Sequence, residues 1–301
     1  MAVNAKGKEN GTKMTQKRRT THKKTSRKGA KKGSTSIFSR LRSIPLWGVI
    51  AGGAGVLAIY CYILIHFFVD PYSFQWKAIY GETVYPQGYN VRGIDISHYQ
   101  QEISWQKLRN ANMDKDPVTF VIIKATEGNT IIDEYFNDNF YQARQNDFVR
   151  GAYHFLTPYV PARKQAEFFL RQVHLTKGDL PPVLDVENEK KWKDAGKDKQ
   201  QIQKMVLEWL QTVEKEYHTK PILYSSYKFR HDILTDSVFN RYPFWMAHYY
   251  VEKPRQDIEW KFWQHTDCGQ LPGIKGLVDC NIFNGDRSQF DSLLIKEDRE
   301  P

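Results

Sequence analysis

From residue 91 onward, short apolar runs rich in Val and Ile alternate with segments whose apolar residues recur at helical spacing. The clearest helical segment is Ile202–Tyr217, where apolar residues return every three or four positions. Continuous apolar strands that alternate with helices are typical of a parallel sheet buried on both faces. The predicted strands are Val91–Ile96, Phe120–Lys124, Val149–Phe155, Pro182–Val186 and Pro221–Tyr224, and the other predicted helices are Trp105–Ala111, Phe136–Asn146 and Pro161–Val173.

Three more strand-like runs follow Tyr224 with little sequence between them for helices: Phe244–His248, Glu259–His265 and Val278–Phe283. We expect these runs to close the sheet in an antiparallel manner. Closure into a barrel is the economical solution because it leaves no exposed sheet edge. The sequence therefore predicts an α/β fold, an eight-stranded (β/α)-type barrel with irregular antiparallel last strands.

Polar and aromatic residues lie at the ends of the predicted strands, where a parallel barrel forms its catalytic face. The fourth strand ends in Leu184–Asp185–Val186–Glu187. Side chains alternate along a strand, so Asp185 and Glu187 point to one face with Cα atoms roughly 6.5–7 Å apart. Such a pair can cleave a glycosidic bond, with one acid protonating the leaving oxygen and the other stabilising or attacking the sugar. The alternative is a pair of ordinary loop carboxylates, one of them capping the next helix.

The remaining strand ends offer groups that suit a carbohydrate, with hydrogen-bonding side chains on the floor of a groove and aromatic rings on its walls. The predicted substrate-binding residues are Tyr99, Lys124, Glu127, Tyr153, Phe155, Tyr224, Trp245, His248, Tyr249 and Gln264. Four histidines at strand ends raise the alternative of a metal hydrolase, but the H-E-x-x-H spacing is missing. We therefore predict no metal and no cofactor, and we expect these histidines to bond sugar or orient acids. They are His98, His154, His248 and His265.

Five segments resemble the motifs of glycoside hydrolase family 25, the lysozymes of bacterial and phage type, and they occur in the family's order. They are GIDISHYQ (Gly93–Gln100), VIIKATEG (Val121–Gly128), GAYHF (Gly151–Phe155), PPVLDVE (Pro181–Glu187) and VDCNIFNGD (Val278–Asp286). The resemblance covers about residues 91–286. It implies an eight-stranded α/β barrel whose last strands depart from the regular pattern.

The resemblance also implies an activity, hydrolysis of the β-1,4 bond between N-acetylmuramic acid and N-acetylglucosamine in peptidoglycan. On the matching motifs, Glu187 corresponds to the general acid. Asp185 corresponds to the residue that assists the sugar's acetamido group or acts as nucleophile, and Asp95 and Asp279 correspond to supporting acids. Cys280 departs from the usual aliphatic residue, which leaves the catalytic positions untouched.

Two alternative functions deserve comparison with this interpretation. A chitinase-like D-x-x-D-x-D-x-E motif would place aspartates at positions 180, 183 and 185, and only Asp185 is one. A non-catalytic glycan-binding barrel would not need the four acids, all of which are present. The sequence therefore favours a hydrolase that acts on peptidoglycan glycan strands.

A basic tail and a long apolar segment precede the predicted barrel. Residues 1–43 hold fourteen Lys or Arg and one acid, Glu9, whereas the rest of the chain holds 30 basic and 33 acidic residues. Residues 46–69 contain His66 as their single potentially charged side chain, and a helix of this length crosses a bilayer. The positive-inside rule places the N-terminus in the cytoplasm and the barrel outside, in a periplasm or beyond the cell. The alternative, a cleaved signal peptide, would have a shorter apolar region followed by small residues.

These features define five predicted regions. They are a disordered basic cytoplasmic tail (1–43), a transmembrane signal anchor (44–69), a stalk with six aromatic residues (70–90), a catalytic domain (91–290) and a polar C-terminal tail (291–301). We interpret the basic tail as a topology signal and predict no nucleic-acid partner. Gly48 and Gly52 have the spacing of a helix-pairing motif, so a weak dimer through the membrane helix is a further hypothesis. Cys268 and Cys280 form a disulfide or remain separate thiols.

Overall fold

The computed structural model describes residues 45–66, 83–187 and 189–297. It divides into two compact units that separate within the amino-terminal helix, so this helix and the barrel are described separately. The helix, α2 (Leu46–Leu64), is the one helix in the described part of the chain that is long and apolar enough to cross a membrane. None of its residues is buried. The predicted basic tail, positions 67–69 of the predicted span and most of the predicted stalk lie outside the described residues.

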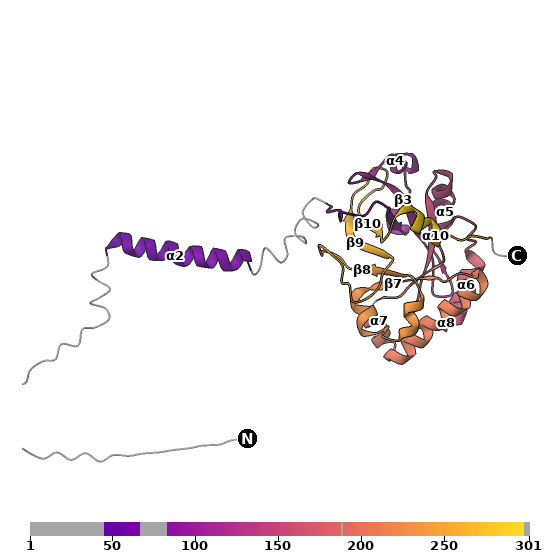
Figure 1. Ribbon diagram of the computed structural model, residues 1–301. Coiled ribbons are helices and arrows are strands. Elements are labelled where there is room, and N and C mark those ends of the chain that lie inside the picture. The colour runs from indigo at the N-terminus through magenta and orange to yellow at the C-terminus, as the bar shows by residue number, and fades with distance from the viewer. Residues whose placement is uncertain (1–44, 67–82, 188, 298–301) are drawn as a thin grey trace, which may run out of the picture. The chain divides into compact units, whose positions relative to one another are not determined.

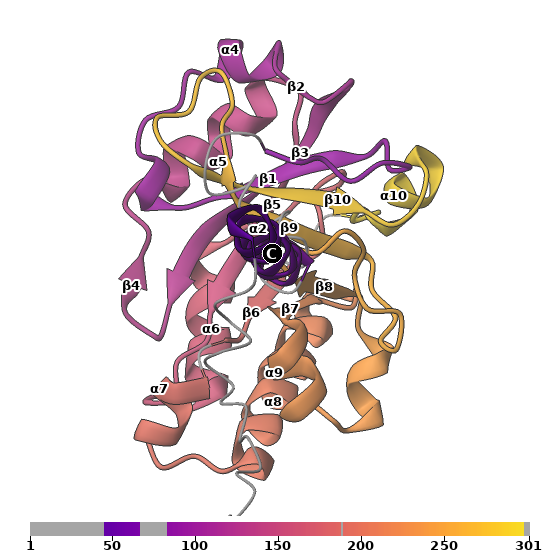
Figure 2. The ribbon, with the colours of Figure 1, turned by 90° about the vertical axis from the view of Figure 1, so that its left-hand side faces the viewer.

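The second unit contains a closed barrel of eight strands (Figures 1 and 2). Around the barrel the strands follow the order β1, β10, β9, β8, β7, β6, β5, β3, and β3 pairs with β1 to complete the ring. Their bounds are β1 Arg92–Ile96, β3 Asp116–Glu127, β5 Val149–Phe155, β6 Val183–Asp185, β7 Ile222–Ser226, β8 Phe244–Ala247, β9 Phe262–Gly269 and β10 Val278–Phe283. The predicted barrel is thereby confirmed.

The antiparallel closure expected for the last three strands is confined to the final one. Strand β8 is parallel to β7, and β9 is parallel to β8. Strand β10 is antiparallel to both of its neighbours, β9 and β1. A parallel connection between β8 and β9 requires a crossover, and residues 248–261 provide it without forming a helix. The sequence between these strands lacks a helical pattern, and for this reason it suggested a reversal of direction.

Helices cover the outside of the barrel, and α6 and α8 pack against each other (Figure 1). The four predicted helices are present as α4 Trp105–Arg109, α5 Phe136–Gln145, α6 Ala162–Gln172 and α8 Lys199–Tyr217. Asp198 begins α8 through a capping box with Gln201, which satisfies free backbone N–H groups of the first turn. Elements too short to show a helical period were not predicted, namely α7 Glu189–Asp194, α9 Tyr227–Asp232, α10 Arg287–Leu293, and the 3-10 turns η3 His98–Gln100 and η4 Ser237–Arg241. The short strands β2 Asn112–Met113 and β4 Ile131–Ile132 both pair with β3.

The barrel separates two apolar cores. The outer core fills the space between strands and helices and includes Trp209 and Phe169, whose rings lie 5.3 Å apart. The inner core contains Phe120, Phe262 and Phe283, which pack against one another inside the barrel. Because the inner aromatic rings fill one end of the barrel, polar side chains are left to occupy the other end, where the parallel strands finish.

Residues 83–90 of the predicted stalk lie against the barrel. Tyr85 and Tyr89 pack on the outer core, and the guanidinium of Arg92 donates to the carbonyl of Pro86 at 3.0 Å. Cys268 and Cys280 are free thiols in this structure. The two cysteines sit on the neighbouring strands β9 and β10.

Gly93 provides a test of the barrel's packing. A Cβ atom at this position would lie 2.4 Å from the ring of Phe120, its cross-strand partner, whereas a Cβ at Gly151 would lie 3.3 Å from Leu180. We expect Gly93→Ala to lower the free energy of unfolding by about 1–3 kcal/mol, the usual effect of overpacking a filled core. Gly151→Ala is the matched control and should destabilise less. Chemical denaturation measures both variants, and equal stability of Gly93→Ala and wild type would contradict this packing.

Candidate active site

A cleft of about 560 Å³ opens at the carboxyl ends of the parallel strands. All four predicted acids line it, although they come from three strands and the segment that follows one of them. Asp95 on β1 and Asp279 on β10 are direct cross-strand partners. Asp185 ends β6, and Glu187 follows two residues later. Barrel closure therefore brings together Asp95 and Asp279, which are 184 positions apart in the sequence.

Two buried amides hold the Asp95 carboxylate. The side-chain amide of Asn281 and that of Gln264 each donate to Asp95 Oδ2 at 2.7 Å. Gln264 also donates to Asp279 Oδ2 at 3.2 Å, so one amide group bridges both acids. Asn281 is fixed in turn, because its Oδ1 accepts from the indole N–H of Trp245 at 2.8 Å.

Gln264 lies beneath the cleft and does not line it. Its side chain is 1% exposed, and its carbonyl oxygen accepts from the hydroxyls of Tyr224 and Tyr249. The amide orientation is thereby fixed, since the oxygen faces the two hydroxyls and the nitrogen faces the two acids. Gln264 acts as a positioning residue for Asp95 and Asp279 and for two tyrosines of the cleft wall.

The segment after β6 is held by contacts to its backbone. The hydroxyl of Ser225 donates to the carbonyl of Val186 at 2.7 Å, and the indole of Trp192 donates to the carbonyl of Glu187 at 3.0 Å. Trp192 belongs to α7 and is buried, so this short helix anchors the chain just after the acid. Both contacts leave the Glu187 carboxyl group facing the cleft.

Burial raises the pKa of each of the four predicted catalytic acids. It raises the pKa of Asp185 well above its ordinary value, and the neighbouring charge of Glu187 adds to the effect. It also raises the pKa of Glu187, against the opposing charges of Lys191 and Lys124. The physical cause is the same in each case, since a low-dielectric site disfavours the ionised form.

The carboxyl groups of Asp95 and Asp279 differ in pKa. Burial raises the pKa of Asp95 to about 6, because the hydrogen bonds from Asn281 and Gln264 favour its ionised form and limit the rise. Burial and then the charge of Asp95 raise the pKa of Asp279 to about 9. At neutral pH the structure therefore favours an ionised Asp95 beside a protonated Asp279.

Eight of the ten predicted substrate-binding residues line the cleft: Tyr99, Lys124, Glu127, Tyr153, Phe155, Tyr224, Trp245 and Tyr249. Gln264 and His248 do not. The ring of His248 stacks on Tyr227 with centroids 5.2 Å apart, and burial lowers its pKa. The side chain of Tyr99 is the most open of the eight, with 78% of its surface exposed.

Cations surround one aromatic ring of the cleft. The ammonium of Lys124 lies 5.2 Å from the ring centre of Phe155, and that of Lys191 lies 5.0 Å from it. Lys124 also forms an ion pair with Glu127 at 2.7 Å. Sequence reasoning missed Lys191, because its helix α7 is only six residues long and gives no periodic signal.

Other residues of the cleft were also missed. Ile96, Ser97, Gln100, Asp267 and Leu277 line it as well, next to His98, which the sequence analysis had named. Asp133 does not line the cleft but holds the segment that contains His98, because its carboxylate accepts from the backbone N–H of His98 at 2.9 Å. Asn281 had a usable signal, since it lies two residues after Asp279 on the same strand and therefore on the same face.

The four strand-end histidines do not meet. Only His98 lines the cleft. His154 is buried outside the barrel between Thr126 and Gln165, and His265 is buried beneath the ring of Tyr85, so neither can reach a sugar. Among residues 45–66, 83–187 and 189–297, no three His, Cys, Asp or Glu side chains form a group that could hold a metal ion.

Comparison with known sequences gives a consistent result. The sequence profile of glycosyl hydrolases family 25 matches residues 94–274. The uncharacterized protein YegX of Escherichia coli (strain K12) is 43% identical over 216 residues, which cover 70% of this chain and 77% of YegX. Lysozyme M1 of Streptomyces globisporus is 30% identical over 217 residues, which cover 67% of this chain and 71% of that protein.

Solved structures agree with the sequences. A family 25 glycosyl hydrolase from Bacillus anthracis superposes with a TM-score of 0.63 at 30% identity and covers 71% of this chain and 97% of its own. The bacterial lysozyme from Streptomyces coelicolor superposes with a TM-score of 0.63 at 28% identity and covers 69% and 98%. The profile match, the relatives and the barrel lead to one conclusion, that this chain belongs to glycosyl hydrolases family 25.

Proposed function

We propose that this chain is a muramidase that hydrolyses the β-1,4 bond between N-acetylmuramic acid and N-acetylglucosamine in peptidoglycan. The observation that carries the proposal is the cleft itself, which Asp185, Glu187, Asp95 and Asp279 line together. The names of relatives support the substrate, since they include Lysozyme M1 and an N,O-diacetylmuramidase from Arthroderma benhamiae that is 28% identical over 215 residues.

In the proposed mechanism Glu187 is the general acid. Burial raises its pKa and so favours the protonated form, which delivers its proton to the glycosidic oxygen as the bond breaks. Asp185 acts on the sugar ring that becomes positively charged as the bond breaks. As a carboxylate, Asp185 either orients the substrate's acetamido oxygen or attacks the anomeric carbon itself. Water then completes hydrolysis as Glu187 returns to its protonated form.

Asp95 and Asp279 support these steps as a pair. An ionised Asp95, held by Asn281 and Gln264, places a negative charge on the floor of the cleft, near where positive charge develops on the sugar. A protonated Asp279 avoids a second charge at the same place. The wall residues Tyr99, Tyr153, Phe155, Tyr224, Trp245 and Tyr249 would hold the glycan, together with Lys124 and Glu127.

The proposed cellular setting follows from the N-terminal part of the chain. Helix α2 is exposed, apolar and long enough to cross a bilayer, and basic residues precede it. We propose a signal anchor with a cytoplasmic N-terminus and an exported barrel. Such a tether would confine hydrolysis to glycan strands near the membrane by raising their effective concentration.

The role of Glu187 gives the first prediction for this mechanism. Glu187→Gln keeps the shape of the side chain but cannot donate the proton, so turnover on peptidoglycan should fall by ~10²–10⁴-fold. Glu189→Gln is the matched control, since Glu189 is two residues away at the start of α7 and pairs with Lys193 outside the cleft. Circular dichroism should show both variants folded. More than about a tenth of wild-type turnover in Glu187→Gln would refute the assignment.

Asp279 gives a prediction about stability and pH. Its folded pKa of about 9 lies above the ordinary value of 3.8, so folding takes up a proton at intermediate pH. The contribution of the Asp279 carboxyl group to the free energy of unfolding is fully present below pH ~4 and declines as the pH rises toward 9. Asn cannot ionise and can still donate to Asp95, so Asp279→Asn should raise Tm at pH 8 and change it much less at pH 4.

The control for this prediction is Asp194→Asn, which changes an exposed acid outside the cleft. Thermal unfolding of wild type and both variants at the two pH values provides the comparison. An Asp279→Asn protein that is less stable than wild type at pH 8 would contradict a protonated Asp279.

The membrane topology has its own test. The full-length protein should remain in the membrane fraction after washing with high salt and with alkali, because a transmembrane helix is held by apolar burial and not by charge. A reporter enzyme that works only outside the cytoplasm should be active when it is fused to the C-terminus. A soluble mature protein that begins near residue 70 would show instead that the segment is a cleaved signal.

A further inference from the structure

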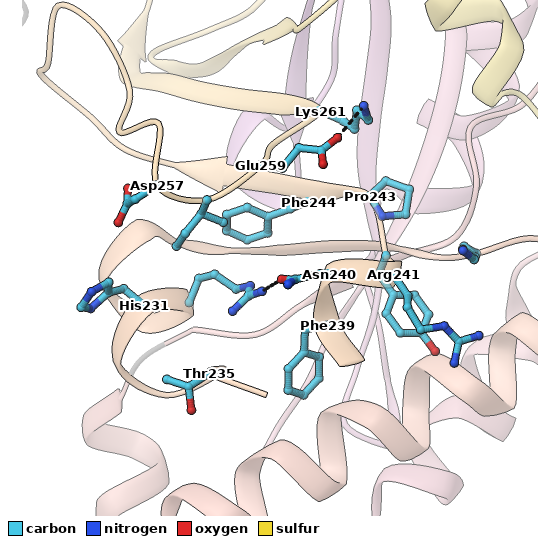
Figure 3. Close-up of a pocket in the computed structure, with 14 residues that line it drawn as sticks. His231, Thr235, Phe239, Asn240, Arg241, Pro243, Phe244, Asp257, Glu259 and Lys261 are labelled. Atoms are coloured by element: carbon cyan, nitrogen blue, oxygen red, sulfur yellow. Dashed lines mark hydrogen bonds and ion pairs between the residues drawn. The ribbon is translucent and has the colours of Figure 1, made fainter. Parts of the chain in front are cut away.

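A second cavity, of about 730 Å³, lies between α9, η4 and the loop that precedes β9 (Figure 3). It shares no lining residue with the catalytic cleft. Figure 3 shows Phe239 and Phe244 on two sides of it, with Asn240 between them. The established family and the proposed reaction assign no role to this place.

The cavity has a structural origin in the irregular crossover between β8 and β9. Each earlier parallel connection of the barrel contains a helix that covers the outer face, whereas residues 248–261 form none. Helix α9 packs against β7, and the next connection adds no helix beyond α9 and η4. The groove that remains is lined by side chains from α9, η4 and residues 257–261.

A buried arginine without an acidic partner lines this cavity. Three arginines in the described part of the chain are buried: Arg92, Arg150 and Arg230. Arg92 pairs with Asp116 at 2.9 Å, and Arg150 pairs with Asp179 at 2.9 Å. Arg230 forms no ion pair with any described residue, although it is only 6% exposed. Buried charges are normally paired, because an isolated one is costly to desolvate.

The protein fixes the Arg230 guanidinium by neutral groups only. It donates to the carbonyl of Leu234 and, at 2.6 Å, to Oδ1 of Asn240. The rings of Phe239 and Phe244 lie 6.0 and 5.9 Å from its central carbon. A guanidinium has five N–H groups in a planar fork, so these two bonds leave donors for a ligand.

The rim of the cavity adds further positive charge. Lys220 and Arg241 line it, are exposed, and form no ion pair within the described residues. The other charged groups at the rim are occupied. Lys261 pairs with Glu259 at 3.0 Å, and Asp257 accepts from the hydroxyl of Tyr227 at 2.9 Å. His231 pairs with Asp232.

We propose that this cavity binds the terminal carboxylate of a short peptide, with Arg230 as the buried partner and Lys220 and Arg241 at the entrance. A single negative charge balances Arg230, the one buried arginine without an ion pair among the described residues. The planar carboxylate matches the guanidinium fork, and the phenylalanine rings accept the apolar carbon next to it. The site is independent of the proposed hydrolysis, and its occupancy is measured without any enzymatic readout.

The test is calorimetric titration of the full-length protein in detergent micelles with N-acetyl-alanyl-alanine and, separately, with its C-terminal amide. The two probes differ only in the charge that the site should recognise. We expect the acid to bind at least ~10-fold more tightly than the amide, the value of one hydrogen-bonded charge pair. The preference should vanish in Arg230→Gln.

Arg230 also holds Leu234 and Asn240, so its replacement could unfold the loop. The double variant Lys220→Gln/Arg241→Gln changes only exposed residues and should weaken binding of the acid severalfold, while Lys107→Gln, outside the cavity, should leave it unchanged. Equal affinity for acid and amide, or a double variant that binds like Lys107→Gln, would overturn the proposal. Inorganic phosphate that binds more tightly than the acid would overturn the assignment to a carboxylate.

Discussion

The arrangement on which the rest of the site depends is the bridge that Gln264 makes between Asp95 and Asp279. One amide nitrogen donates to both acids, while the amide oxygen accepts from Tyr224 and Tyr249. Without such donors, an ionised carboxylate on the floor of a buried cleft would be strongly disfavoured. Together with the amide of Asn281, the bridge favours the charge on Asp95, and it sets the positions of wall and floor together.

The barrel makes this bridge possible by separating apolar and polar layers. Phe120, Phe262 and Phe283 fill the interior on one side, and Gly93 leaves room for the ring of Phe120. Two residues further along β1, the same inward face carries Asp95. Burial supplied by the apolar layer raises the pKa of the acids above it, so fold stability and catalytic protonation arise from the same packing. The acids lower stability at neutral pH in return, which is a common compromise at active sites.

Much of this could be predicted from the sequence. Apolar runs identified all eight barrel strands. Asp185 and Glu187 both line the cleft, although β6 ends at Asp185 and strand alternation therefore does not extend to Glu187. The short helices α7, α9 and α10 were missed because six or seven residues show no period. The direction of β9 was misjudged because its crossover from β8 lacks a helix.

The function of individual polar residues was harder to predict, because it depends on which side chains meet in three dimensions. Gln264 looked like a sugar ligand, but it lies under the floor of the cleft. His248, at a similar strand end, stacks on Tyr227 instead. The missing carboxylate partner of Arg230 has no sequence signature at all, since only the packed structure shows which acids come near.

The central claim concerns the bond that the cleft cuts, and the most direct measurement is mass spectrometry of the new reducing ends in digested peptidoglycan. Purified protein is incubated with peptidoglycan, and the released fragments are reduced to label their reducing sugars. The account predicts N-acetylmuramic acid at the new reducing ends, and it predicts that Glu187→Gln releases almost none. N-acetylglucosamine at those ends, or fragments cut only in the peptide, would contradict it.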